Sequence, residues 1–263
     1  MRKRSTLDSP LRLLLYGYPG SMKTRTAATA AQHPLTSPCL LMNAGGNPET
    51  LADYDLSPDI IDMERLEDFN DPYDWIMNGQ PKDHPLVEEF GLNHGPYRSI
   101  IIDQLTKVQG MYFERVMGTS PSTMKVATVV PKREWEHYNK ILYTMIRFAS
   151  LYWALPIHVI MIAQEREGDP GTGRLIGPHL EGQAAVEVSS GALVIGRMMH
   201  VTRAEARIRK ALQELDADSI AVFKQSQTFI AKDQQGGRLG EYMVNPTIPK
   251  MVDLIYGNTS APD

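Results

Sequence analysis

The chain has 263 residues, of which 42% are apolar and 22% are charged, and its formal net charge is −4. These fractions are close to the globular average, which excludes a fibrous or generally disordered chain. The acidic excess argues against a protein that coats nucleic acid by bulk electrostatics, although it is compatible with a local basic face. Cys39 is the only cysteine, so an internal disulfide is excluded.

The length allows one large α/β domain or two small ones, and we expect one. It would span residues 11–257, between a basic tail at residues 1–10 and a short tail at residues 258–263. The basic start is followed only by a short apolar run, which does not make a secretory signal. No apolar run approaches the roughly 18 residues of a membrane span. We therefore expect a cytoplasmic protein with no membrane segment.

The first half of the chain predicts short strands separated by loops and helices. Leu13–Tyr16 is an apolar run that ends at Gly17, and Lys23–Gln32 contains no helix breaker, so we expect a strand, a loop and a helix. Cys39–Met42 and Ile60–Met63 also predict strands. A polar region with several Pro and Gly residues follows the second of these.

The middle of the chain gives the clearest pattern. Ser99–Asp103 is an apolar run closed by a carboxylate, as in a strand buried on both faces of a parallel sheet, and a helix is expected over Leu105–Met117. Gly118–Pro131 has no periodicity and predicts a loop, whereas spacings of three and four predict a long amphipathic helix over Lys132–Tyr152. The apolar run Ile157–Ala163 predicts another core strand, and a Gly-rich loop follows it.

The last third is expected to contain strands over Ala192–Val201 and Ser219–Ala231, a charged helix over Ala204–Leu215 and a final helix over Pro249–Tyr256. Strands that alternate with helices favour a doubly wound α/β domain, with a mostly parallel central sheet flanked by helices. Ligands of such sheets bind at the carboxyl ends of the strands.

The segment between the first strand and the first helix predicts a phosphate site. Its sequence is Gly17-Tyr18-Pro19-Gly20-Ser21-Met22-Lys23-Thr24, followed by Arg25. A Gly-rich loop that runs into a helix N-terminus supplies converging NH donors for phosphates, and the lysine reaches the β and γ phosphates. The threonine hydroxyl and a strand-end carboxylate, here Thr24 and Asp103, would hold Mg²⁺. We therefore expect ATP and Mg²⁺ to bind here.

One position departs from the full phosphate-loop pattern. Glycine is expected immediately before the lysine, and this chain has Met22. A thioether would be tolerated there if its side chain pointed away from the nucleotide and the backbone stayed helical. We expect weakened affinity but not its loss.

Taken in order, Gly17–Thr24, Ser99–Asp103 and Ile157–Gln164 resemble the RecA-like P-loop ATPases, in particular small phage-encoded, AAA-type members. The looser motifs Arg133-Glu134-Trp135, Ala231-Lys232-Asp233 and Gly236-Gly237-Arg238-Leu239 are also similar to that group. The resemblance implies an ATPase that binds single-stranded DNA in phage recombination, by annealing or strand exchange, in the host cytoplasm. It also implies a homo-oligomer, either a ring or a filament.

The resemblance further implies roles for individual residues. Gln164 would sense the γ phosphate and relay the nucleotide state to the loop after it. Lys232, or alternatively Arg238, would reach the nucleotide of a neighbouring protomer. The basic residues that flank two loops beside the nucleotide edge would contact DNA; these are Lys125, Lys132, Arg133, Arg166 and Arg174.

A water-activating carboxylate is missing where the family carries one, because the second strand is followed by Asn43-Ala44-Gly45-Gly46. Gln104, next to Asp103, can orient water but cannot accept its proton. The remaining candidates for the base are Glu49, Glu64 and Glu165. We expect slow hydrolysis with binding retained. Two alternatives stay open: a P-loop small-molecule kinase, with a lid built from the arginines around Arg197, and a nucleotide-dependent binding module that does not hydrolyse ATP.

Overall fold

The structure, a computed structural model, describes residues 9–46, 48–49, 51, 56, 58–92, 95–119, 134–201 and 217–257. In this part of the chain, ten strands form one sheet in the order β10-β8-β7-β1-β5-β4-β2-β3, with β6 beside β5 and β9 beside β7. The strands are β1 (Arg12–Gly17), β2 (Cys39–Asn43), β3 (Asp59–Asp62), β4 (Ser99–Asp103), β5 (His158–Arg166), β6 (Gly177–Pro178), β7 (Val194–His200), β8 (Ser219–Val222), β9 (Lys232–Asp233) and β10 (Tyr242–Val244).

The helical elements are α1 (Lys23–Ala28), the 3₁₀ turns η2 (Thr29–Gln32) and η4 (Leu66–Phe69), α2 (Asn70–Met77), α3 (Pro85–Glu89), α4 (Leu105–Met117), α5 (Trp135–Trp153), α6 (Ala184–Gly191) and α8 (Ile248–Tyr256). None of the helices in the described ranges is long and apolar enough to cross a membrane.

The centre of the sheet is parallel. Strands β3, β2, β4, β5, β1 and β7 all run in one direction, and only the edge pairings of β8, β10, β9 and β6 are antiparallel. Strands β2 and β4 are buried along their whole length, because their apolar side chains face helices on both sides. The predicted mostly parallel sheet flanked by helices is confirmed.

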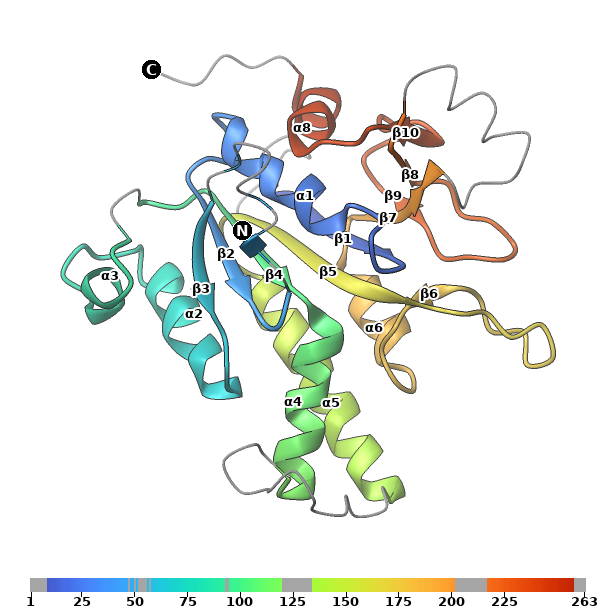
Figure 1. Cartoon of the computed structure of the whole chain (residues 1–263), viewed down its shortest axis with the longest axis horizontal. Coiled ribbons are helices and arrows are strands. Elements are labelled where there is room, and N and C mark those ends of the chain that lie inside the picture. Colours follow the sequence, from blue (N-terminus) through green and yellow to red (C-terminus); the bar gives the residue numbers. More distant parts are fainter. Residues whose placement is uncertain are drawn as a thin grey trace, which may run out of the picture.

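Two apolar layers cover the two faces of this sheet (Figure 1). Helices α1 and α8 lie on one face, where Ile248, Met251 and Ile255 of α8 pack on Leu13 and Leu15 of β1. Helices α2, α4, α5 and α6 lie on the opposite face, which holds the larger cluster. Every helix that follows a central strand therefore starts near the same edge of the sheet, where the strands end.

Most predicted elements are present with small shifts, but three differences have local causes. The first helix changes to a 3₁₀ turn after Ala28. The strand expected over Ser219–Ala231 ends at Val222, because the Ser226 hydroxyl accepts hydrogen bonds from the backbone NH groups of Thr228 and Phe229 and forms a turn instead of a ladder. Helices α2 and α6 were not predicted. The helix expected over residues 204–215 lies outside the described residues, as does most of the predicted loop 118–131.

Candidate nucleotide-binding site

The loop between β1 and α1 closes tightly because two glycines allow it. A Cβ atom on Gly17 would lie 2.2 Å from the carbonyl oxygen of Met198 in β7, so no side chain fits there. Gly20 has a φ of +76°, a left-handed conformation that glycine adopts without steric cost. Ser21 donates its backbone NH to the Tyr18 carbonyl at 3.2 Å and completes the turn. The loop thus leads β1 directly into the N-terminus of α1.

Lys23 is folded into this loop. Its Nζ donates hydrogen bonds to the carbonyl oxygens of Gly17 and Tyr18, each at 2.8 Å, and to Ser21 Oγ at 3.3 Å. The side chain is buried, and this burial lowers the pKa of Lys23 to about 8, although the negative charges of Asp103 and Glu165 oppose the shift. A buried ammonium held only by carbonyl groups is a strong site for an anion.

Met22 lies in the left-handed region, with φ 65° and ψ 19°. The expectation that its backbone would stay helical is therefore wrong. The turn needs a positive φ at this position, which is the physical reason why glycine suits it. Met22 and Arg25 line a groove of about 250 Å³ beside α1, and the Arg25 guanidinium lies 3.9 Å from the Asp218 carboxylate.

The hydroxyl of Thr24 donates to Asp103 Oδ2 at 2.6 Å. Asp103 is the last residue of β4 and is buried, and its desolvation raises the pKa of its carboxyl, while the Thr24 bond and the Lys23 charge oppose this. The sequence therefore identified two residues 79 positions apart that meet at the start of α1. Hydroxyl and carboxylate oxygens together are hard ligands of the kind that Mg²⁺ prefers.

Two amide side chains border the same edge. Gln164 in β5 pairs in register with Gly17 of the loop, and its backbone NH donates to the Thr106 hydroxyl at 3.1 Å. The side-chain oxygens of Gln164 and of Gln104 are buried and have no hydrogen-bond partner among the described residues. Buried polar atoms without a partner are rare in native proteins and indicate ordered water or a ligand.

Asn43 and Asp62 also lie at this edge, although the sequence pattern did not single them out as functional residues. Asn43 ends β2 and Asp62 ends β3, and Asn43 Nδ2 donates to Asp62 Oδ1 at 2.6 Å. Asn43 Oδ1 accepts the backbone NH of Gly46 at 2.7 Å. The available signal was a polar residue closing each of two neighbouring strands, but strand-end polar residues are too common to be selected on that ground alone.

Glu165 cannot be the water-activating base that it was expected to offer. Its two carboxylate oxygens accept hydrogen bonds from Arg197 Nε and Nη2, both at 2.9 Å, and its side chain is fully buried. Arg197 also lies over the ring of Phe229, 5.0 Å from the centroid. This pair ties β5 to β7, so Arg197 is equally unavailable as the lid arginine of a kinase.

The two cations considered for action in trans are both engaged within the chain. Lys232 Nζ donates to the carbonyl oxygens of Ser190 and Ala192 at the end of α6, at 3.1 Å and 2.6 Å. Arg238 donates to the carbonyl oxygen of Ile255 near the end of α8. Each neutralises helix carbonyl groups, so reaching a neighbouring protomer would require these contacts to break. The role in trans stays a prediction.

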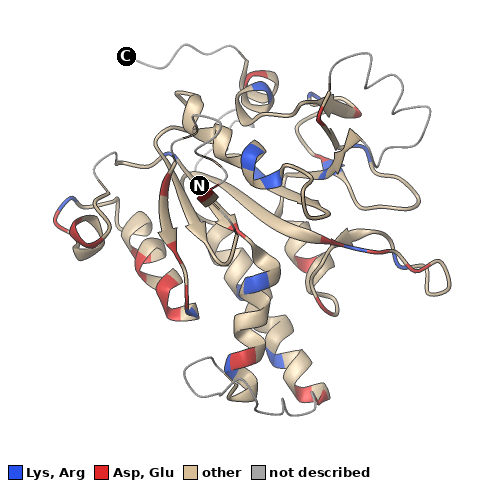
Figure 2. Cartoon of the chain, viewed as in Figure 1, with Lys and Arg blue, Asp and Glu red and all other residues tan. Residues whose placement is uncertain are grey.

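The basic residues predicted for DNA contact fall into two groups. Lys125, Lys132 and Arg133 lie outside the described residues. Arg166 and Arg174 belong to the hairpin that follows Gln164, which extends away from the sheet and carries charges of both signs (Figure 2). Arg166 donates to the Leu180 carbonyl at 3.0 Å, and burial together with the nearby Arg174 lowers its pKa. Tyr18 of the loop donates to Glu167 at the base of this hairpin, at 3.1 Å.

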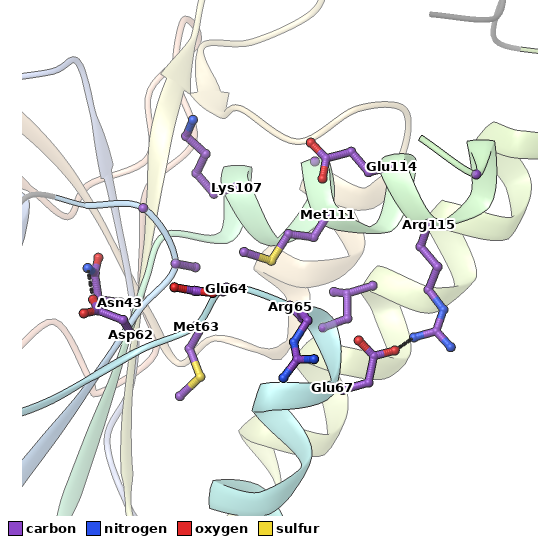
Figure 3. Close-up of a pocket in the computed structure, with 15 residues that line it drawn as sticks. Asn43, Asp62, Met63, Glu64, Arg65, Glu67, Lys107, Met111, Glu114 and Arg115 are labelled. Atoms are coloured by element: carbon purple, nitrogen blue, oxygen red, sulfur yellow. Dashed lines mark hydrogen bonds and ion pairs between the residues drawn. The ribbon is translucent and has the colours of Figure 1, made fainter. Parts of the chain in front are cut away.

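A wide cleft of about 1000 Å³ opens at the ends of β2 and β3. Figure 3 shows the bonded Asn43 and Asp62 at one end of it, with Lys107, Met111 and Glu114 of α4 on another wall. The loop of Lys23 and Asp103 thus has an open cleft beside it on the side of Asp62.

A search against protein-family models finds no match for this sequence, and a search of the curated proteins finds none either. Among solved structures, the chain is similar to the ATPase domain of a helicase, with a TM-score of 0.40 and 11% identity over 95% of this chain and 84% of that chain. It is also similar to the RadB recombinase, with a TM-score of 0.35 and 14% identity over 72% of this chain and 74% of that chain. Superpositions at these scores assign no function, so the function must come from the contacts within this chain.

Proposed function

We propose that this protein is a RecA-like P-loop ATPase that binds Mg²⁺ and ATP at Gly17–Thr24 and hydrolyses ATP slowly. The observation that carries the proposal is the buried Lys23 ammonium inside the loop, next to the bonded pair of Thr24 and Asp103. These groups lie at the carboxyl edge of a parallel sheet, where ligands of such folds bind. A triphosphate would replace the carbonyl groups as the partner of Lys23.

The residues present fit this ligand. Thr24 and Asp103 offer oxygen ligands for Mg²⁺, which would neutralise charge on the phosphates during transfer. The unpartnered oxygens of Gln104 and Gln164 fit a site that holds ordered water beside the γ phosphate. Gln164 is in register with the first loop residue, as a sensor of the γ phosphate requires.

Slow turnover follows from what the site lacks. No carboxylate stands at residues 43–46, Gln104 is an amide, and Glu165 is bound to Arg197. A positioned general base typically contributes about 10²–10⁴-fold to a rate. A site without a carboxylate at the usual position should therefore bind ATP well and turn it over poorly.

We further propose that the ATPase acts on single-stranded DNA, as a phage recombination protein in the host cytoplasm, and that it works as a homo-oligomer, a ring or a filament. The support is the charged hairpin after Gln164, whose base contacts the phosphate loop through Tyr18 and Glu167. A nucleotide that moves Tyr18 would alter this contact. Lys232 acting in trans belongs to this part of the proposal.

Turnover measured with and without single-stranded DNA separates this proposal from its two rivals. Hydrolysis that DNA stimulates supports the recombination ATPase. Transfer of the γ phosphate to a small molecule, independent of DNA, would show a kinase instead. Binding without any turnover would show a nucleotide-dependent binding module.

A further inference from the structure

We propose that Asp62, held in place by Asn43, is the group that accepts the proton of the attacking water. This inference rests on the proposed ATPase function and supplies the base that the sequence lacks. Asp103, Asn43 and Asp62 end three adjacent parallel strands and are register partners, Asp103 with Asn43 and Asn43 with Asp62. Register partners in parallel strands point to the same face of a sheet, here the face that α1 covers.

Hydrogen bonds join Asp62 to the predicted metal site. Asp62 accepts from Asn43 Nδ2 at 2.6 Å, and Asn43 Oδ1 accepts from the backbone NH of Gly46 at 2.7 Å. Gly46 in turn lies against Asp103: a Cβ atom on it would be 3.1 Å from Asp103 Oδ2. The row from Thr24 through Asp103 and Asn43 to Asp62 is therefore continuous, and its last member is a carboxylate.

The properties of Asp62 suit a base. It is exposed to solvent, unlike Asp103, so a proton taken from water can leave again. Asn43 is neutral, so it orients the carboxylate without repelling it, which is the task of the third group in a nucleophile–base–orienter arrangement. Glu64 is nearby at the rim of the cleft but does not bond to Asn43 (Figure 3).

The step balances as a simple hydrolysis. The water oxygen forms a bond to the γ phosphorus, and the bond from that phosphorus to the β–γ bridging oxygen breaks. The bridging oxygen keeps the electron pair as part of ADP. One proton of the water passes to the Asp62 carboxylate and then to solvent, and the second stays on the released phosphate. Asn43 is a positioning residue in this scheme, because it acts through Asp62.

The test measures phosphate release in a single turnover, with protein in excess over ATP, beside ATP affinity from the fluorescence of a labelled nucleotide. Asp62→Asn should lower release by about 100-fold, the usual contribution of a general base, and leave affinity within about twofold. Asp62→Glu should retain part of the rate. Asn43→Ala should slow release, yet add nothing in an Asp62→Asn background, since residues that act as a unit are not additive.

Glu64→Gln is the matched variant, because it removes a neighbouring carboxylate charge from the same rim; it should release phosphate like the wild type. If Asp62→Asn turns over like the wild type, or if Glu64→Gln is the slow variant, the assignment of Asp62 is overturned. Wild-type protein that binds ATP but releases no phosphate also overturns it, while binding at the loop stands. Wild-type protein that does not bind ATP overturns the proposed function itself.

Discussion

At the scale of single residues, Lys23 makes nucleotide binding depend on pH. Burial lowers its pKa to about 8, so the free protein loses this positive charge as the pH rises through that value. A bound triphosphate favours the charged lysine, so binding in this range takes up a proton. ATP affinity should be flat below about pH 8 and then fall, approaching about tenfold per pH unit. Titrations with ATP at stepped pH measure this. The residual binding of Lys23→Ala should show no such fall, and a wild type without it would contradict the burial of a charged lysine.

Met22 gives a second residue-scale prediction. A residue other than glycine in the left-handed region costs about 1–2 kcal/mol, and glycine returns up to about 1 kcal/mol of this as chain entropy. Met22→Gly should therefore raise the free energy of unfolding by up to about 1 kcal/mol. Met22→Ala keeps the Cβ atom and should not raise it. Urea denaturation compares the two variants, and an equal gain for both would show that the strain is not at this backbone position.

Sequence reasoning succeeded where the chemistry is local and failed where it depends on distant partners. The loop Gly17–Thr24 could be predicted because its residues are contiguous, and Asp103 because it closes an apolar strand. The conformation of Met22 could not, because the φ that the turn requires is set by closure between β1 and α1. Glu165 was mistaken for an available base, since its partner Arg197 lies 32 residues away.

At the scale of elements, β1, β4 and α4 could be predicted because each has one dominant signal. Two are uninterrupted apolar runs, and α4 ends at Gly118, which adopts the left-handed conformation of a helix C-cap. Helix α2 escaped prediction because it is short and carries Pro72, which is tolerated only because it lies in the first turn. Helix α6 buries mainly alanines, whose weak apolar contrast hides the period.

The pair of Glu165 and Arg197 should behave as a buried ion pair that joins β5 to β7. Removing one partner leaves the other charge buried, which typically costs about 3–5 kcal/mol. Glu165→Leu and Arg197→Met should each be strongly destabilised in urea. The double variant should lose much less than the sum of the two, because no uncompensated charge remains. Additive losses would mean that the two side chains do not depend on each other.

At the scale of the whole molecule, the net charge of −4 means that any grip on DNA must come from local cations. Affinity for single-stranded DNA should fall linearly on a plot of log affinity against log salt. Arg174→Ala, at the exposed hairpin, should reduce the slope by about 0.7, the value for one phosphate contact on a single strand. Lys82→Ala, an exposed lysine between α2 and α3, is the matched control and should leave the slope unchanged. Affinity that ignores salt would exclude electrostatic contact with the phosphate backbone.

The most direct test of the whole account is calorimetry of ATP binding in the presence of Mg²⁺. The wild type and Lys82→Ala should bind ATP with measurable heat at one site per chain. Lys23→Ala should bind at least about 30-fold more weakly, because removing a buried charged partner of an anion costs about 2 kcal/mol or more. No heat from the wild type, or equal affinity in Lys23→Ala, would contradict a nucleotide held in the Gly17–Thr24 loop.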